Sequence, residues 1–142
     1  HDERAAPVSM IVLHYTGMPT CEGALDRLCS PEAKVSCHYL VDEDGTLYSL
    51  VPEERRAWHA GKSFWRGIRD VNSASIGIEI VNPGHEFGYR PFPDEQIATL
   101  IPLVAHLKDR HGIGRGNVVG HSDIAPTRKE DPGELFPWEA LA

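Results

Sequence analysis

The feature that most constrains this chain is a set of apolar runs long enough for buried strands but too short to span a membrane. Two such runs occupy residues 8–15 and 75–81, whereas a membrane helix takes about 20 consecutive apolar residues. In the second run three isoleucines alternate with Gly77 and Glu79, so the isoleucines share one face of the expected strand. A third short strand is expected at 117–120. The chain is therefore predicted to build a sheet, and no transmembrane segment is expected.

Two local signals predict a short helix and a hairpin in the first third of the chain. Thr20 can accept a backbone hydrogen bond at a helix start, so we expect a helix from there through Leu28. The sequence Asp-Glu-Asp-Gly at 42–45 provides a glycine for a tight turn. The flanking segments 36–41 and 46–51 are therefore expected to pair as an antiparallel hairpin.

The longest helix is expected at residues 94–111, where apolar side chains recur every three to four positions. Gly112 is suited to end this helix, and Pro102 removes one of its backbone hydrogen bonds, so a kink is expected there. Residues 121–137 are expected to form a loop. Because strands and helices alternate without a strict βαβ rhythm, the expected fold is α/β, with a central mixed β-sheet flanked by a few α-helices.

Size, charge and cysteine content narrow the class of protein. A chain of 142 residues fits a single domain, expected over residues 1–142 with a flexible segment at 1–7. With a formal net charge of −7, the chain lacks the excess of basic residues that is typical of a general nucleic-acid binder. If residues 21–29 are helical, Cys21 and Cys29 lie about 12 Å apart, too far for a disulfide. Free thiols favour the cytoplasm, and the absence of an initial methionine leaves the periplasm as the alternative.

The histidines divide into two groups by their position. His1, His106 and His111 are expected to be solvated, because the first is terminal and the other two fall in or at the end of the long helix. His14 and His121 each lie where an apolar strand runs out into a loop, and ligand sites gather at strand ends in open α/β sheets. A single histidine at such a point is more often structural, so a third group is needed to indicate a site.

Asp131 supplies that third group. Pro132 biases it towards extended backbone, in which Lys129 and Asp131 face the same side. Two imidazoles and one carboxylate with an open fourth position are the composition of a catalytic zinc site, whereas structural zinc sites use four ligands rich in cysteine. One zinc ion per chain, held by His14, His121 and Asp131, is therefore the metal hypothesis.

Glu79 and Lys129 are candidates for the chemistry itself. Glu79 interrupts a strand rich in isoleucine, so either that face is open to solvent or the carboxyl has a raised pKa and accepts a proton from water. Lys129 is either a solvated surface side chain or the cation that stabilises an oxyanion on the attacked carbonyl. The pattern by itself leaves both pairs of alternatives open.

Five segments, in this order, resemble the zinc-dependent N-acetylmuramoyl-L-alanine amidases of the type 2 amidase family. This family is related to the T7 phage lysozyme and to the peptidoglycan recognition proteins. The segments are Val-Leu-His-Tyr-Thr around His14, His-Tyr-Leu-Val-Asp-Glu-Asp-Gly at 38–45, Trp-His-Ala-Gly at 58–61, Ser-Ile-Gly-Ile-Glu at 75–79, and 120–133. The last, Gly-His-Ser-Asp-Ile-Ala-Pro-x-Arg-Lys-x-Asp-Pro-Gly, is the most specific, and the resemblance covers roughly residues 8–138.

The resemblance implies a fold, a reaction and roles for five residues. His14, His121 and Asp131 would bind zinc, Glu79 would activate or orient water, and Lys129 would stabilise the tetrahedral intermediate. The implied reaction is hydrolysis of the amide between N-acetylmuramic acid and L-alanine in bacterial peptidoglycan or muropeptides. Relatives of the recognition-protein or T7 pattern usually carry cysteine at the third ligand position. Asp131 matches instead the branch with cell-wall recycling amidases and an outer-membrane amidase.

Six further residues are candidates for binding the substrate, with ordinary core or surface packing as the alternative. Aromatic residues near 58–65 can wall a groove for a sugar or peptide, and polar residues after them can contact an acidic stem peptide or the cleft rim. The candidates are Trp58, His59, Phe64, Arg69, Asn72 and Asn82.

Two other functions compete with the amidase. A muropeptide-binding module without catalysis is disfavoured, because all three ligand positions and both catalytic positions are filled. The spacing of the motifs does not distinguish the amidase from a zinc peptidase that acts on stem peptides. The sequence carries no signal for an oligomeric state.

Overall fold

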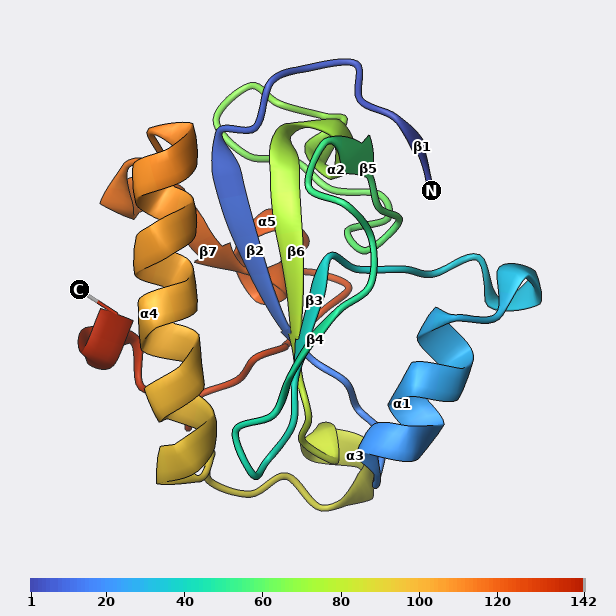
Figure 1. The fold of residues 1–142 in the computed structure, drawn as a ribbon, viewed down its shortest axis with the longest axis vertical. Coiled ribbons are helices and arrows are strands. Elements are labelled where there is room, and N and C mark those ends of the chain that lie inside the picture. Colours follow the sequence, from blue (N-terminus) through green and yellow to red (C-terminus); the bar gives the residue numbers. More distant parts are fainter. Residues whose placement is uncertain (142) are drawn as a thin grey trace.

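A five-stranded sheet with strand order β4-β3-β6-β2-β7 forms the centre of the molecule (Figure 1). This computed structural model describes residues 1–141. The strands are β2 (Met10–Tyr15), β3 (Tyr39–Val41), β4 (Leu47–Ser49), β6 (Ser75–Ile80) and β7 (Val118–Gly120). Four of them run parallel, and β4 pairs antiparallel with β3 at one edge. The predicted mixed sheet and the predicted hairpin are therefore both confirmed.

Short helices and one long helix surround this sheet. They are α1 (Cys21–Leu28), α2 (Val71–Ala74), α3 (Gly84–Phe87), α4 (Asp94–His111) and α5 (His121–Ile124). Single 3₁₀ turns occur at η1 (Pro31–Ala33), η2 (Arg115–Asn117) and η3 (Trp138–Leu141). Within residues 1–141 no helix has both the length and the apolarity needed to cross a membrane.

The larger core lies between the sheet and α4. The three alternating isoleucines of β6 pack together with Ile11 and Leu13 of β2 and with Leu100, Val104 and Leu107 of α4. All of these side chains are buried, so the apolar stripe of the long helix packs against one face of the central strands. α4 ends at Gly112 as predicted, in the left-handed conformation at φ 63°, and it continues through Pro102.

The opposite face of the sheet carries a smaller apolar core, and it becomes polar towards the carboxyl ends of the strands. Met10 and Val12 of β2 pack against residues of α2 and α5, including Val71 and Ile124. Because side chains alternate along a strand, the next β2 residue on this face is His14. The carboxyl end of this face is thus polar, and this is where the sequence places its candidate site.

Local details confirm some expectations and correct others. The Thr20 hydroxyl accepts a hydrogen bond from the Gly23 N–H at 3.0 Å, as predicted for the start of α1. The prediction of a continuous loop over 121–137 is wrong, because its first four residues form α5. The prediction that His111 is solvated is also wrong, since its Nε2 lies 2.8 Å from Glu53 Oε1 and the ring is largely buried.

The N-terminal segment and the cysteines complete the fold. Residues 1–7, for which we expected flexibility, include β1 (Asp2–Glu3), which pairs antiparallel with β5 (Arg55–Arg56). The Arg4 side chain donates hydrogen bonds to the carbonyls of Glu53, Ser73 and Ser75. The three cysteines are free, as predicted.

Candidate active site

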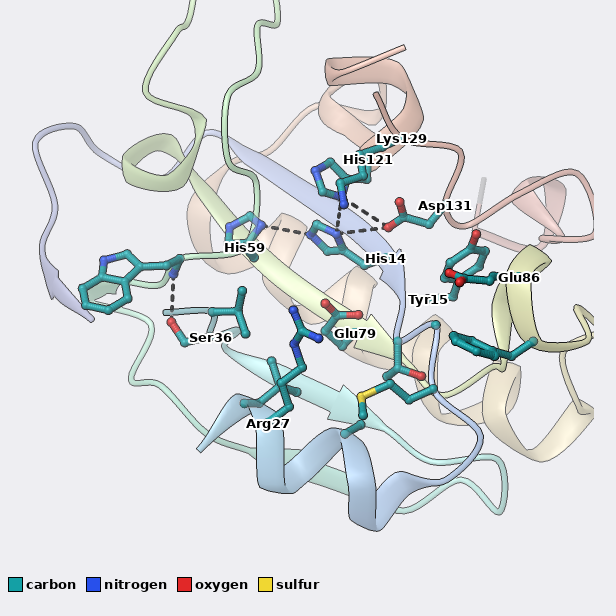
Figure 2. A pocket seen from close by; sticks show the side chains of 18 residues that line it. His14, Tyr15, Arg27, Ser36, His59, Glu79, Glu86, His121, Lys129 and Asp131 are labelled. Atoms are coloured by element: carbon teal, nitrogen blue, oxygen red, sulfur yellow. Dashed lines mark hydrogen bonds and ion pairs between the residues drawn. The ribbon is translucent and has the colours of Figure 1, made fainter. Parts of the chain in front are cut away.

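A cavity of about 490 Å³ opens at the carboxyl ends of β2 and β6 (Figure 2). Its walls come from β2, α1, β6 and the segments around residues 58 and 129. Elements far apart in the sequence meet here because parallel neighbouring strands end at the same edge of the sheet. Ligand sites in open α/β sheets occupy this position.

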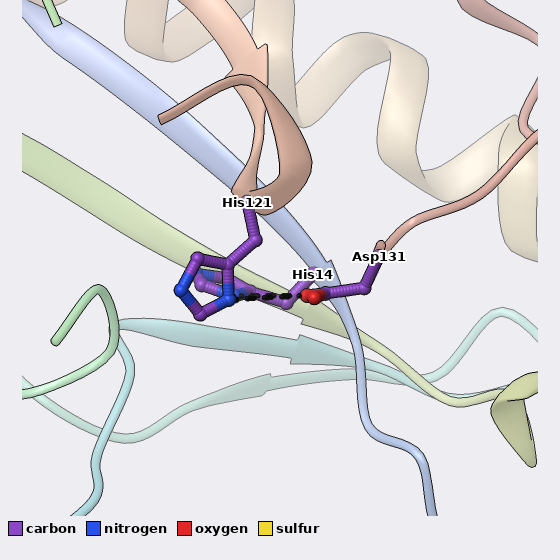
Figure 3. A group of neighbouring side chains, drawn as sticks. All are labelled: His14, His121 and Asp131. Carbon is purple, nitrogen blue, oxygen red and sulfur yellow. Dashed lines mark hydrogen bonds and ion pairs between the residues drawn. The ribbon is translucent and has the colours of Figure 1, made fainter. Parts of the chain in front are cut away.

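Three side chains converge at one wall of this cavity (Figure 3). His14 lies near the end of β2, and His121 follows β7 directly, whose Gly120 is in register with Leu13. The Nδ1 atoms of the two histidines are 2.9 Å apart, and Asp131 Oδ2 lies 3.2 Å from His14 Nδ1 and 3.3 Å from His121 Nδ1. The three residues predicted as ligands are therefore brought together, and all three are buried.

The spacing and protonation of these atoms fit a zinc ion. Zinc bonds of about 2.0–2.2 Å in tetrahedral geometry separate neighbouring ligand atoms by about 3.3 Å. The His121 Nε2 donates to the Ala60 carbonyl at 2.8 Å, so the neutral ring presents a lone pair on Nδ1 towards the other two groups. The donor set is two nitrogens and one oxygen, as in catalytic zinc sites.

The charge states of His14 and Asp131 suit metal binding as well. Burial lowers the pKa of His14, which favours the neutral imidazole. Burial opposes ionisation of Asp131, but its contacts with His121 and His14 hold the pKa of this carboxyl below its usual range. Metal ligands must be deprotonated, so a lowered pKa in either group favours binding of a metal.

Glu79 enters the same cavity from the neighbouring strand. It is the register partner of His14 in the β2–β6 pair, so both side chains leave the sheet on the same face. Its Oε2 is buried and has no hydrogen-bond partner among residues 1–141. Burial raises the pKa of Glu79 well above its usual value, and the charge of Asp131 adds to the effect. The structure therefore places this carboxyl inside the cavity rather than on a solvated face.

Lys129 lines the cavity on the chain that leads from α5 to Asp131, beside His121 in Figure 2. The residue is exposed, and its ammonium makes no ion pair with the residues that the structure describes. An unpaired cation facing a cavity is available to a bound anion or to an oxygen that develops negative charge.

Comparison with known proteins decides the family. The family model Amidase_2, described as N-acetylmuramoyl-L-alanine amidase, matches residues 4–134. The chain belongs to the Amidase_2 family. This agrees with the resemblance found in the sequence.

Individual members of the Amidase_2 family are similar over most of this chain. The chain is 42% identical over 147 aligned residues to the N-acetylmuramoyl-L-alanine amidase AmiD of Escherichia coli, covering 95% of this chain and 52% of that protein. It is 34% identical over 158 residues to the 1,6-anhydro-N-acetylmuramyl-L-alanine amidase AmpD of Haemophilus influenzae, covering 97% of this chain and 84% of that protein. The chain thus spans about half the length of AmiD.

A solved structure of a family member confirms the fold. The complex of E. coli AmiD with the substrate anhydro-N-acetylmuramic acid-L-Ala-D-gamma-Glu-L-Lys superposes with a TM-score of 0.86 at 41% sequence identity. The match covers 99% of this chain and 59% of that one. The α/β architecture predicted for this Amidase_2 member is therefore correct.

Only two of the six predicted substrate-binding residues line the cavity, namely Trp58 and His59. The structure does not bring the other four into its wall. Phe64 is 52% exposed, with the guanidinium of Arg69 5.7 Å from its ring centroid. The Asn72 side-chain oxygen accepts from two backbone N–H groups at 3.1 and 2.8 Å, and Asn82 is buried, with Nδ2 donating to the Arg90 carbonyl at 2.8 Å.

The Amidase_2 cavity also contains residues that the sequence reasoning missed. Arg27 and Leu28 of α1 line it together with Ala24, and Glu86 and Phe87 line it as well. Positions 24, 27 and 28 share one face of a helix, because residues three and four apart are neighbours. This spacing in the predicted helix could have identified the α1 wall.

Proposed function

We propose that this chain hydrolyses the amide bond between the lactyl group of N-acetylmuramic acid and L-alanine, in peptidoglycan or in muropeptides. The convergence of His14, His121 and Asp131 on one point, in a cavity that also holds Glu79 and Lys129, carries this proposal. Membership of the Amidase_2 family supports the reaction, and the substrate in the AmiD complex, a muropeptide, supports the substrate class.

One zinc ion, held by the three ligands through two nitrogens and one carboxylate oxygen, is part of this proposal. Zinc bound in such a site polarises a carbonyl oxygen and lowers the pKa of water to about 7. The protein's own contribution is to hold the two imidazoles and the carboxylate rigidly at the sheet edge, where β2 and β7 end side by side. An open side of the site faces the cavity and can admit the scissile amide.

Glu79 is assigned to proton transfer. A carboxyl with a raised pKa can accept and then donate a proton during a reaction, and the buried Oε2 of Glu79 has no hydrogen-bond partner within residues 1–141. Glu79 would accept a proton from the attacking water and deliver it to the amino group of L-alanine as the C–N bond breaks. The bond that forms is between the water oxygen and the lactyl carbonyl carbon.

Lys129 is assigned to charge stabilisation. The carbonyl oxygen gains negative charge when the tetrahedral intermediate forms, and a nearby ammonium favours that state over the planar amide. The side chain makes no ion pair with other described residues, so no partner has to be displaced.

Mass spectrometry of digested peptidoglycan tests the proposal against both alternatives. Incubation of purified peptidoglycan with the zinc-loaded protein is expected to release stem peptides with a free L-alanine amino terminus. Cleavage within the stem peptide would indicate the zinc peptidase instead. Binding to peptidoglycan without any new amino terminus would indicate a non-catalytic module.

The proposal also includes a compartment, namely the reducing cytoplasm of a bacterium. The curated relatives described above are bacterial proteins. The three free cysteines support a reducing compartment, which favours the cytoplasm over the periplasm. A disulfide detected in protein purified from its native host would contradict this assignment.

A further inference from the structure

We propose that His59, supported by Ser75, is a positioning residue that fixes His14 in the tautomer whose Nδ1 lone pair faces the metal. The inference rests on the zinc site of the proposed function and adds a residue that determines how the site is preorganised. Its basis is a chain of hydrogen bonds that, for neutral imidazoles, gives each proton one consistent position.

The chain begins at a backbone carbonyl. Ser75 Oγ lies 2.6 Å from the Val71 carbonyl oxygen, which can only accept, so the serine hydroxyl proton points to it. The same Oγ lies 3.0 Å from His59 Nε2. Because its only proton is already used, Ser75 must accept at this contact, and His59 must carry a proton on Nε2.

The constraint passes from His59 to His14. A neutral imidazole with a proton on Nε2 has a lone pair on Nδ1, and His59 Nδ1 lies 3.0 Å from His14 Nε2 (Figure 2). His14 must therefore donate from Nε2, which leaves its Nδ1 as the lone pair directed at His121 and Asp131.

The residue after His59 acts on the second histidine ligand. The Ala60 carbonyl accepts from His121 Nε2 at 2.8 Å, so two consecutive residues set the tautomers of both imidazole ligands. Asn72 holds this pair in place, since its side-chain oxygen accepts from both the His59 and the Ala60 N–H groups. Arg128 donates to the same Ala60 carbonyl at 2.9 Å. Outer groups of this kind orient metal ligands and typically change metal affinity by about 10–100-fold when removed.

Gly77 explains how the His59 ring reaches this position. A Cβ atom on residue 77 would lie 2.4 Å from Cγ of His59, a distance at which atoms overlap. Only glycine leaves the strand surface open for the ring, which accounts for a glycine among the isoleucines of β6. The space for His59 is thus built into the sheet beside Glu79.

Zinc affinity of substituted proteins tests the proposal. His59→Leu is expected to weaken zinc binding by about 10–100-fold in a competition titration with a fluorescent chelator. His59→Asn is expected to retain most of the affinity, because its side-chain oxygen can accept where Nδ1 did. Ser75→Ala is expected to fall between the two. Ser73→Ala is the matched control, since Ser73 is equally buried but bonds to Asp70, and its affinity should equal that of the wild type.

The tautomer of His14 is a second readout that does not depend on activity. Nitrogen-15 NMR of the metal-free wild type is expected to show a proton on His14 Nε2, and His59→Leu should give a mixture of the two tautomers. A His14 proton on Nδ1 in the wild type, or unchanged zinc affinity in folded His59→Leu protein, would overturn the proposal. If His59→Leu does not fold, the wild-type tautomer and the Ser75→Ala affinity still decide.

These outcomes are distinguishable from failure of the proposed function. A wild type that binds no zinc would contradict the metal site itself. A wild type that binds zinc only as tightly as His59→Leu would contradict the role of His59 alone. Amidase activity with an unchanged His14 tautomer in every variant would likewise keep the function and reject the positioning role.

Discussion

The two faces of β2 and β6 use the same backbone for different purposes. On the face covered by α4, Ile11, Leu13 and the β6 isoleucines are completely buried among apolar neighbours. On the other face, Met10 and Val12 give way to His14, with Gly77 and Glu79 beside them on β6. The twofold alternation of a strand thus separates residues that stabilise the fold from residues that line the candidate site. Substitutions on the two faces should therefore change different measured quantities.

Glu79→Ala tests the polar face and has the largest expected effect. Loss of a general acid–base typically lowers the rate by about 10²–10⁴-fold, so turnover of a muropeptide measured by chromatography should fall within that range. Zinc content and the free energy of unfolding should not decrease, because the removed Oε2 has no partner among residues 1–141. Glu54→Ala, at an exposed position, is the control. Turnover close to that of the wild type would remove Glu79 from the mechanism.

Leu100→Ala tests the opposite, apolar face. The side chain is completely buried against the sheet, so its truncation should lower the free energy of unfolding by about 2–5 kcal/mol in urea denaturation. Ile101→Ala, at the neighbouring helix position that is 38% exposed, should cost less than about 1 kcal/mol. Zinc affinity per folded molecule should be unchanged in both. A loss of zinc affinity with intact stability would show that the two faces are not independent.

Lys129→Ala tests the polar face again, at another residue that lines the cavity. Its contact with the substrate oxygen should strengthen in the transition state, so kcat should fall by about 10²–10³-fold while KM changes little. Lys62→Ala is the matched control, because Lys62 is exposed nearby but lies outside the cavity wall. A change confined to KM would instead identify Lys129 as a substrate-binding residue.

His38, which contacts the backbone of Gly77 on β6, links stability to pH. Burial is the main cause that lowers its pKa from 6.5 to about 4, and the charge of Arg4 acts in the same direction. The Nδ1 atom accepts from the Gly77 N–H at 3.0 Å, a bond that protonation would remove. Between pH 6.5 and 4 the unfolded chain binds a proton at His38 that the folded chain does not. Stability should therefore fall as the pH is lowered through this window, by about 3 kcal/mol in total.

Denaturation at a series of pH values checks this expectation. The free energy of unfolding of the wild type should decrease from pH 7 to pH 4.5, and the slope should be shallower in His38→Gln, whose side chain does not titrate. Equal slopes in the two proteins would assign the pH dependence to other groups, such as the other buried histidines.

Local patterns in the sequence identified the main strands, the long helix and the three residues of the candidate metal site. Alternating isoleucines identified β6, apolar periodicity identified α4, and the positions of His14 and His121 at strand ends identified the edge of the sheet where they meet. The resemblance to the amidase family then gave roles to Glu79 and Lys129. The same reasoning mistook the start of α5 for loop and His111 for a solvated residue, because the Glu53 partner of His111 is 58 positions away.

Periods of two and about four residues along the chain are enough to tell which residues occur at the ends of strands and which faces are apolar. The orientation of the imidazoles depends on contacts that exist only in the folded chain. His14 and His59 are separated by 45 positions, and His14 and His121 by 107. The direction of a hydrogen bond depends on atoms that no local pattern brings together, so the relay from Ser75 through His59 to His14 became visible only once the chain was folded.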